Sequence, residues 1–312
     1  MPELPDVTVY VESLVAHVRG ATLERVRLAS PFLLRTVEPP LSETVGREVI
    51  GVARLGKRIV ISLAGELHLV LHLMIAGRLR WTALDAASVR PTPPRKVGLA
   101  AFDFSTGTLL LTEAGTKRRA SLHLVRGSEG LATHARGGVE PLEASAAELG
   151  VALRRESHTL KRALTDPRIV SGIGNAYSDE ILHRARLSPL MRTQKLADDD
   201  VTKLHHAVVD VLSEWTARLR DEARSGGGWP EKVTAFREGM AVHGKFKQPC
   251  PVCGAAVQRI VYADNETNYC ARCQTGGKLL ADRSLSRLLR DDWPRNLDEL
   301  EELHSASKGD GR

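Results

Sequence analysis

The chain has 312 residues, of which 42% are hydrophobic and 26% are charged, a composition typical of a globular protein with two or three domains. It contains no apolar run of about 18 residues, so we expect no membrane-spanning helix. The first residues, MPELPD, lack the basic and apolar regions of a secretory signal, which favours a cytoplasmic protein, associated with the nucleoid if its source is bacterial. The net charge of +6 favours a polyanionic partner such as nucleic acid, although it also fits a basic surface without such a partner.

The first predicted element is an amphipathic helix close to the N-terminus. Apolar residues recur from Val7 to Val18 at the three- and four-residue spacing of one buried helix face. Asp6 is the candidate N-cap, and Gly20 is the expected end of the helix. We therefore expect this helix to hold the N-terminus near a core.

Residues 45–125 form a region of short, β-rich segments. Ser105-Thr106-Gly107 is a hairpin signal between two of these segments, and the proline-containing stretch 88–96 is a predicted surface loop. The pattern predicts a β-sandwich or barrel-like domain. The predicted strands are residues 58–63, 68–73, 99–104 and 108–112.

Helical patterns dominate the chain after a glycine- and proline-containing stretch around residue 140. Gly137-Gly138 and Pro141 indicate a linker, and a serine followed by three glycines at 225–228 closes the helical region. Another amphipathic helix is expected at residues 284–290, whereas residues 291–312 have few apolar side chains and are expected to be flexible. The predicted helices of the middle region are residues 147–155, 159–165, 175–186 and 198–223.

All four cysteines of the chain fall into two matched pairs, Cys250-x2-Cys253 and Cys270-x2-Cys273, separated by 16 residues. This spacing is typical of a structural zinc site, in which four thiolates close a tetrahedron around one Zn2+ ion. Two redox motifs or plain buried thiols are the alternatives, but neither requires two matched pairs. With no cysteine left over for a disulfide, the chain fits a reducing compartment.

A glycine-rich loop joins two of the predicted helices at residues 160–177. Gly172 and Gly174 permit backbone conformations that other residues avoid, and Asn175 is a candidate cap for the helix that follows. Free N–H groups at such a helix start can hold a phosphate oxygen, and Lys161 adds positive charge nearby. The alternative is an ordinary helix hairpin with a tight glycine turn.

Together these features resemble the formamidopyrimidine-DNA glycosylase / endonuclease VIII (Fpg/Nei) family of DNA repair glycosylases. That family combines an N-terminal Pro-Glu, a β-sandwich domain, a helix-two-turn-helix and a C-terminal four-cysteine zinc finger. This chain carries all four features in the same order over roughly residues 1 to 280. The resemblance implies an α+β multidomain fold, with an N-terminal β-sandwich and its flanking helices, a helical helix-two-turn-helix domain and a C-terminal zinc-finger β-hairpin.

The linker signals and the resemblance together predict five segments. They are an N-terminal catalytic β-sandwich domain at 1–135, a linker at 136–150, a helix-two-turn-helix DNA-binding domain at 151–235, a zinc-finger domain with an added helix at 236–290, and a flexible tail at 291–312.

The resemblance gives Pro2 and Glu3 a chemical role. Because Pro2 is small, Met1 should be removed, which leaves a free secondary amine at the new N-terminus. At pH 7 the neutral fraction of an α-amino group is about 200-fold larger than that of a lysine, and only the neutral amine attacks carbon. By resemblance, Pro2 attacks C1′ of the damaged nucleoside, Glu3 donates the proton that assists opening of the sugar ring, and Lys57 binds phosphate and helps the elimination. Alone, Met-Pro-Glu is an ordinary start, and Lys57 also fits a solvated lysine before a strand.

Three positions depart from the family pattern. Asn265 stands where the family carries an arginine at the start of the finger hairpin, so a phosphate contact there lacks a charge. The family's gap-filling methionine lies one place after Met74, where this chain has Ile75, and both residues also fit a core strand. Arg118 matches an arginine that would face the orphaned base, but no aromatic wedge follows it. The implied DNA-binding residues are Lys161, Asn175, Arg118, Met74 and Asn265.

We therefore expect a monomeric, bifunctional DNA glycosylase and AP lyase of base-excision repair. It would remove oxidised bases from double-stranded DNA through a Schiff base, followed by β- or β,δ-elimination. One alternative is a lesion- or abasic-site-binding protein, or an AP lyase only, that has lost base excision. Another is a zinc-ribbon protein that contacts RNA or a polymerase, which explains the cysteines but neither the N-terminus nor the glycine loop.

Overall fold

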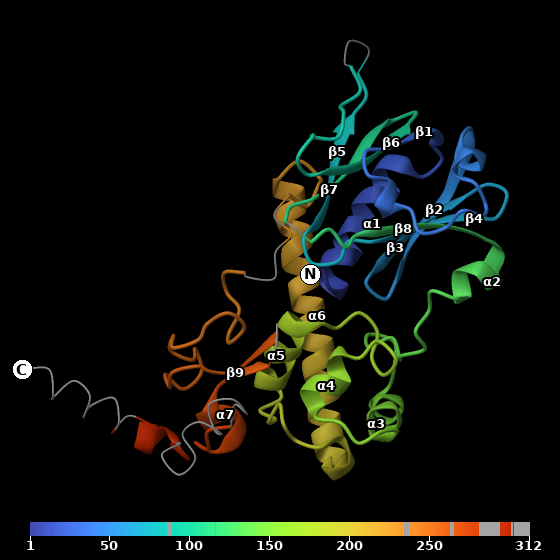
Figure 1. The fold of residues 1–312 in the computed structure, drawn as a ribbon. Helices are drawn as coiled ribbons and strands as arrows, with labels where there is room; N and C mark the ends of the chain where they lie inside the picture. The colour runs from blue at the N-terminus through green and yellow to red at the C-terminus, as the bar shows by residue number, and fades with distance from the viewer. Residues whose placement is uncertain are drawn as a thin grey trace, which may run out of the picture. The chain divides into compact units, whose positions relative to one another are not determined.

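The computed structural model describes residues 1–85, 89–115, 117–231, 233, 237–262, 265–280, 294–300 and 302. The chain divides into two compact units. Unit 1 comprises Met1–Gly137 and Ser213–Ala235, and unit 2 comprises Gly138–Leu212 and Phe236–Arg312 (Figure 1). Among the described residues, no helix combines the length and the apolar composition that a membrane crossing requires. The boundaries of the five predicted segments stay predictions.

Unit 1 contains the helix α1 (Leu4–Val18), eight strands and the short helix α2 (Gly127–Ala132). All strand pairs are antiparallel, and the strand order is β5-β7-β6-β1-β2-β3-β4-β8. The strands are β1 (Thr22–Leu28), β2 (Arg47–Leu55), β3 (Arg58–Leu63), β4 (Leu67–His72), β5 (Gly77–Ala83), β6 (Gly98–Phe104), β7 (Gly107–Glu113) and β8 (Ser121–Arg126).

The sheet of unit 1 consists of two halves that share one core. β1 and β2 are joined only through the pairs Thr22↔Glu48 and Leu23↔Arg47, whereas the other neighbours pair along most of their length. Alternating residues of both halves, such as Phe102 and Ile61, belong to one buried hydrophobic cluster together with the apolar face of α1. This arrangement confirms the predicted sandwich.

The predicted first helix is present, but its cap was assigned to the wrong residue. α1 begins at Leu4 with Glu3 as N-cap, and Asp6 lies at the third helical position. The Asp6 carboxylate accepts the Glu3 backbone N–H at 2.9 Å, as in a capping box. A capping box has an acceptor side chain both at the N-cap and three residues later. The sequence pattern alone therefore does not tell whether Glu3 or Asp6 is the cap.

Unit 2 contains a helical part and a finger. The helices are α3 (Ala146–Arg154), α4 (Leu160–Thr165), α5 (Asn175–Arg184) and α6 (Asp198–Ser225), of which α6 extends from unit 2 into the part of unit 1 that begins at Ser213. The finger contains the hairpin β9 (Gln258–Tyr262) and β10 (Asn265–Tyr269) and the short helix α7 (Ala271–Thr275). This content agrees with the predicted fold class.

The C-terminal stretch was predicted to be an added helix and a flexible tail. The helix at 284–290 lies outside the described residues. Of the tail, residues 294–300 pack against the finger, because Leu297 is buried in the same hydrophobic cluster as Leu279. Two backbone bonds hold the segment, from Leu279 to the Arg295 carbonyl and from Leu297 to the Gly277 carbonyl.

Candidate active site and DNA-binding residues

Pro2 and Glu3 lie at the buried start of α1. The exposed fraction of Glu3 is only 3%, and its position as N-cap fixes its backbone by the contact with Asp6 described above. The apolar face of α1 is in the core, so the first turn is held at a defined place in unit 1. The sequence prediction that this helix fixes the N-terminus therefore agrees with the structure.

The terminal amine of the chain, which belongs to Met1, is partly buried beside charged side chains. Burial lowers the pKa of this amine; Arg78 and Lys57 lower it as well, whereas Glu3 and Asp6 raise it. A lower pKa increases the neutral fraction of an amine at pH 7. The environment at the start of α1 therefore favours a nucleophilic amine, with two cations and two carboxylates close to it.

Lys57 lies in the turn between β2 and β3. Gly56 has a φ of 61°, a left-handed conformation that glycine adopts without strain, and the turn brings Lys57 toward the terminal amine. Arg78 reaches the same region from β5, where its guanidinium donates to the carbonyl groups of Gly77 at 2.7 Å and Ile75 at 3.2 Å. The structure therefore brings Lys57 to the predicted site and adds Arg78, which the sequence analysis did not select.

Met74 and Ile75 occupy the tight turn between β4 and β5. Met74 has a φ of 51°, and its backbone N–H donates to the His72 imidazole at 3.1 Å. Ile75 follows with an exposed fraction of 62%. The turn requires glycine at position 77, because a Cβ atom there would lie 2.2 Å from the Leu73 carbonyl oxygen. Ile75 is thus not a core strand residue, and it is the apolar side chain that the turn presents to solvent.

Arg118 belongs to the loop between β7 and β8. Its guanidinium donates to the Lys96 carbonyl, and its side chain is exposed. The buried carboxylate of Glu113 organises this loop by accepting the backbone N–H groups of Arg119 at 2.9 Å and Ala120 at 3.0 Å. Two N–H groups on one carboxylate restrain the backbone that carries Arg118.

The glycine loop of unit 2 differs from the prediction in one detail. Gly174, and not Asn175, is the N-cap of α5. The Asn175 side chain instead donates from Nδ2 to the Glu266 carbonyl oxygen of β10 at 2.9 Å. Asn175 therefore connects the start of α5 with the finger hairpin, a tertiary contact over 91 residues that the sequence does not reveal.

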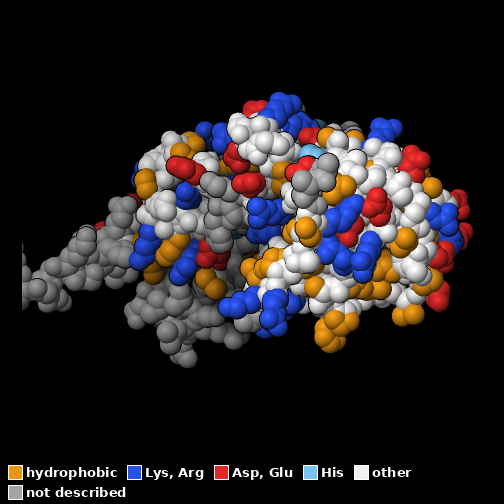
Figure 2. Space-filling view, turned by 90° about the horizontal axis from the view of Figure 1, so that it is seen from above, with side chains coloured by type: hydrophobic (Ala, Val, Ile, Leu, Met, Phe, Trp, Pro, Cys, Tyr) orange, Lys and Arg blue, Asp and Glu red, His pale blue; other side chains and the backbone are white. Residues whose placement is uncertain are grey.

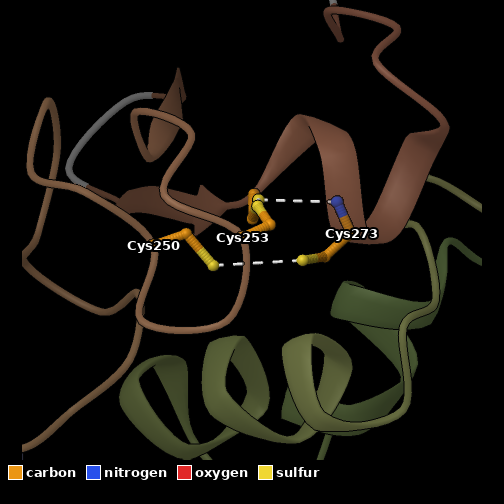
Figure 3. Close-up of side chains that lie close together, drawn as sticks. Cys250, Cys253 and Cys273 are labelled. Carbon is orange, nitrogen blue, oxygen red and sulfur yellow. Dashed lines mark hydrogen bonds between the residues drawn. The ribbon is translucent and has the colours of Figure 1, made fainter.

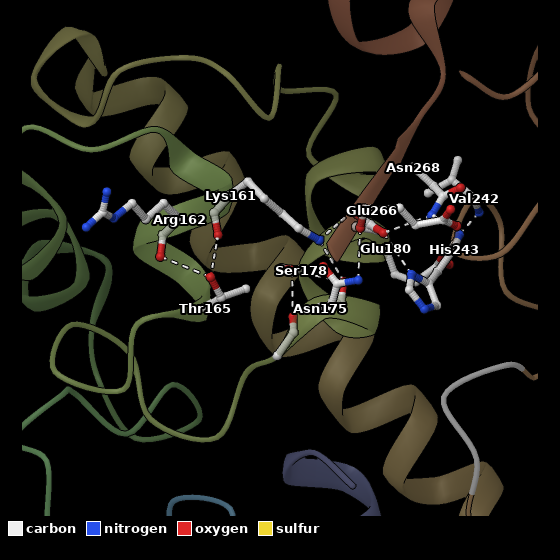
Figure 4. A network of polar contacts seen from close by, with 12 residues as sticks. Lys161, Arg162, Thr165, Asn175, Ser178, Glu180, Val242, His243, Glu266 and Asn268 are labelled. Atoms are coloured by element: carbon white, nitrogen blue, oxygen red, sulfur yellow. Dashed lines mark hydrogen bonds and ion pairs between the residues drawn. The ribbon is translucent and has the colours of Figure 1, made fainter. Parts of the chain in front are cut away.

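Lys161 is buried within unit 2. Its Nζ donates to the Asn175 carbonyl oxygen at 2.7 Å and to Oδ1 of Asp179 at 2.5 Å, and its exposed fraction is 9%. Figure 4 shows Lys161 reaching from α4 toward the start of α5, whereas Arg162 points to the opposite side. The Lys161 ammonium thus supports the backbone at Asn175.

Asp179 is the buried centre of this network. Besides Lys161, its carboxylate accepts the His243 ring at 2.7 Å and the Asn268 amide at 3.5 Å. The adjacent Glu180 accepts the backbone N–H groups of residues 241, 242 and 243 at 2.7, 2.9 and 2.9 Å (Figure 4). Burial raises the pKa of Glu180, against the effect of these three donors. Both carboxylates, placed in the second turn of α5, therefore hold segments of the finger to the helical part of unit 2.

The four cysteines converge in the finger. Their Sγ atoms all lie within 4.8 Å of one another. The Sγ atoms of Cys250 and Cys273 are 3.9 Å apart (Figure 3), and those of Cys253 and Cys270 are 3.4 Å apart. Tetrahedral zinc with Zn–S bonds of about 2.3 Å needs sulfur atoms roughly 3.8 Å apart, so the donor set fits one Zn2+ ion. The prediction of a structural zinc site is confirmed. Asn265 begins β10 in the same finger, but its side chain lies outside the described residues.

Basic side chains are scattered over the face of the molecule drawn in Figure 2. Lys and Arg side chains form several separate groups there, interspersed with acidic and apolar side chains.

Comparison with known proteins identifies the family. Residues 1–120 match the formamidopyrimidine-DNA glycosylase N-terminal domain, residues 138–222 the helix-two-turn-helix domain of the same enzymes, and residues 247–276 the zinc finger found in these glycosylases and in isoleucyl-tRNA synthetases. A formamidopyrimidine-DNA glycosylase of Lactobacillus helveticus is 30% identical over 278 residues, which are 88% of this chain and 99% of that protein. The chain belongs to the formamidopyrimidine-DNA glycosylase family. This membership confirms the predicted class of function, a DNA glycosylase of base-excision repair.

Solved structures agree with this assignment. The crystal structure of the Thermus thermophilus enzyme is 30% identical and superposes with a TM-score of 0.71, covering 88% of this chain and 98% of that one. The Lactococcus lactis enzyme in complex with DNA that contains FAPY-dG is 24% identical, with a TM-score of 0.75 and coverage of 88% and 100%. The second likeness shows the shared fold.

Arg78, Glu113 and Asp179 are the site residues that the sequence analysis missed. Arg78 is the second residue of β5, three residues after Ile75, and its position was the only signal that could have indicated it. Glu113 and Asp179 carried no signal, because their partners are backbone groups or residues far away in the sequence. The structural role of such a carboxylate becomes visible only when the groups that it contacts in the fold are known.

Proposed function

We propose that this chain is a bifunctional glycosylase and AP lyase that acts on double-stranded DNA with a damaged base or an abasic site, through a Schiff base on Pro2. The observation that carries the proposal is the terminal amine, partly buried beside Glu3, Lys57 and Arg78, in a chain of this family. Removal of Met1 would make the adjacent Pro2 nitrogen the new terminal amine, at the same buried start of α1.

The reaction follows from the properties of a secondary amine. The neutral nitrogen of Pro2 attacks C1′ with its lone pair, and the bond from C1′ to the base breaks. The base leaves with the electron pair of that bond and takes up the proton that the Pro2 nitrogen loses. Glu3 donates the proton to the ring oxygen as the sugar opens and the iminium forms. Because a proline iminium keeps its positive charge, it withdraws electrons from C2′, so loss of a C2′ proton expels the 3′-phosphate. The reaction ends there if it is a β-elimination, whereas in a β,δ-elimination a second step also expels the 5′-phosphate.

Lys57 and Arg78 have complementary parts in this scheme. Both lower the pKa of the Met1 amine, the residue before Pro2, so both cations lie close to the proposed nucleophile. Both also place positive charge where a departing phosphate carries two negative charges. We assign phosphate binding to Lys57 and support of the Ile75 turn to Arg78, because the Arg78 guanidinium already donates to carbonyl groups of that turn.

The chemistry requires an extrahelical nucleotide, because C1′ and the base are inaccessible in a stacked duplex. We assign the filling of the vacated space to Ile75, which is exposed at the tip of its turn, in place of the predicted Met74. Arg118 is assigned to the orphaned base. An apolar side chain at a turn and a cation on a restrained loop are suited to these two tasks.

Asn175 and the finger hairpin are proposed to bind the DNA backbone. The Lys161 ammonium is committed to Asp179 and to the Asn175 carbonyl, so its contribution to DNA binding is indirect, through the position of Asn175. Asn265 would add an uncharged phosphate contact from the start of β10. Contacts of this kind position the protein on DNA without reading sequence.

The zinc ion would be held by Cys250, Cys253, Cys270 and Cys273. With four thiolate ligands it has no open position for a catalytic water, so it supplies structural stability to the hairpin and no chemistry to the reaction. We further propose that the protein acts as a monomer, in the compartment that holds the DNA.

Trapping with borohydride tests the proposed function. The protein is incubated with a duplex that contains either an abasic site or one oxidised base from a panel of purine and pyrimidine lesions, and borohydride is then added. A covalent adduct is expected with both kinds of duplex, and Pro2→Gly should abolish most of it, whereas Pro31→Gly, at an exposed proline, should not.

Two results separate the alternatives. An adduct with the abasic duplex but with no lesion of the panel identifies an AP lyase that has lost base excision. Binding of the damaged duplex without any adduct identifies a lesion-binding protein. Either result contradicts the proposed glycosylase.

A further inference from the structure

One face of α5 carries three titratable side chains that all bond to the finger. Asp179 contacts the His243 ring at 2.7 Å, Glu180 accepts the His243 backbone N–H at 2.9 Å, and Nε2 of His183 lies 3.3 Å from Sγ of Cys250. Positions 179 and 180 both lie beside position 183 on the helix surface, because they precede it by four and three residues. The first two contacts hold the backbone of the finger, whereas the third reaches a zinc ligand.

The contact between His183 and Cys250 is buried on both sides. The exposed fractions are 6% for His183 and 2% for Cys250, so water does not compete for either atom. A cysteine that binds zinc is a thiolate, which accepts hydrogen bonds and cannot donate them. In the zinc-loaded protein the hydrogen of this contact must therefore reside on Nε2 of His183.

We propose that His183 is the outer hydrogen-bond donor to the zinc ligand Cys250, and that it acts as a positioning residue for the metal site. The Nε2–H group of His183 partly neutralises the charge of the Cys250 thiolate and restricts its orientation. Outer partners of this kind orient metal ligands, and their loss lowers metal affinity about 10- to 100-fold. A role in simple packing would require only the volume of the ring.

The same helix connects the zinc site with the proposed DNA-binding residue Asn175. α5 begins at Asn175 and ends at Arg184, and just beyond its end the Leu187 carbonyl accepts the Gln274 side chain of α7 at 2.9 Å. The metal site thus contacts the C-terminal half of α5 through His183 and the segment after it through Gln274. Loss of zinc should therefore destabilise α5 as well as the finger.

The rate of zinc release tests the proposal in the full-length, zinc-loaded protein. Transfer of zinc to a chromophoric chelator is followed for wild type, His183→Phe, His183→Gln and the control His206→Phe, which changes an exposed histidine of α6. His183→Phe keeps the ring but removes the donor, so release should accelerate about tenfold or more. His183→Gln retains an N–H donor and should release zinc more slowly than His183→Phe, while the control should match wild type.

The 15N NMR spectrum of the histidine side chains in the wild-type protein gives a second test, which does not depend on whether a variant folds. In the zinc-loaded protein the His183 side chain should be the tautomer with hydrogen on Nε2. Hydrogen on Nδ1 alone, or equal zinc release from folded His183→Phe and wild type, would overturn the proposal. Neither measurement depends on catalysis, so failure of the glycosylase scheme would leave this test intact.

Discussion

Replacement of Asp179 with asparagine removes one negative charge from the interior of unit 2. The carboxylate of Asp179 is buried and accepts Nζ of Lys161 at 2.5 Å and the His243 ring at 2.7 Å. Asparagine has nearly the same shape, so the substitution changes charge and hydrogen bonding without creating a cavity. It leaves the Lys161 ammonium, which is 9% exposed, without its ionic partner.

The expected cost follows from the burial of both partners. Removal of one member of a buried ion pair typically costs about 3 to 5 kcal/mol, because an uncompensated charge remains in the interior. Since about 1.4 kcal/mol corresponds to a factor of ten in an equilibrium constant, 3 kcal/mol corresponds to a more than 100-fold increase in local opening. The pair between Arg168 and Asp166 has side chains that are 63% and 13% exposed; because water solvates the Arg168 guanidinium, loss of this pair leaves no buried charge and should matter much less.

Hydrogen exchange of the α5 amides measures this difference. Asp179→Asn should increase exchange in peptides from α5 about 100-fold or more, whereas the matched control Asp166→Asn should change it less than about fivefold. The double variant Asp179→Asn with Lys161→Met should recover part of the loss, because the unpaired ammonium is then absent. If Asp179→Asn exchanges like the control, the network does not stabilise unit 2, and the indirect role assigned to Lys161 is wrong.

Three other predictions concern pH, the Ile75 turn and zinc. Burial lowers the pKa of His72 to about 4 in the folded protein. In the unfolded chain His72 binds a proton already near pH 6.5. The free energy of unfolding should therefore fall by up to about 3 kcal/mol as pH decreases from about 6.5 to 4. Urea unfolding of His72→Gln should show a shallower decline than wild type, and parallel profiles would contradict this. Ile75→Ser should weaken binding of a lesion duplex about tenfold, whereas Ile50→Ser, at an exposed β2 position, should not; equal effects would remove the gap-filling role. Chelation of zinc should accelerate hydrogen exchange at residues 250–273, with recovery on adding Zn2+; unchanged exchange would show that the finger is stable without metal.

The elements that were predicted well have local causes. The strand at residues 58–63 was predicted with the bounds that β3 has, because the β-branched run Ile59-Val60-Ile61 lies at its centre and glycines lie at positions 56 and 65 on either side. The four cysteines were identified as one site, because two matched pairs at this spacing are typical of a tetrahedral metal site. In both cases the information lies within short stretches of the chain.

The details that were missed depend on distant partners. Asn175 is a favourable cap by type, yet its amide bonds to the Glu266 carbonyl, so Gly174 takes the cap position. Lys161 resembles a phosphate-binding lysine by sequence, whereas its charge is neutralised by Asp179, 18 residues later. A sequence lists the side chains that can donate and accept, but the choice among acceptors is made by tertiary packing.

The central claim is that the nitrogen of Pro2, freed from Met1, captures the sugar at C1′. Peptide mapping of the borohydride-trapped adduct by mass spectrometry tests it most directly. The N-terminal peptide should begin at Pro2 and carry the reduced deoxyribose on its nitrogen, with no adduct on Lys57. An adduct that maps to a lysine, or active protein that retains Met1, would contradict the account.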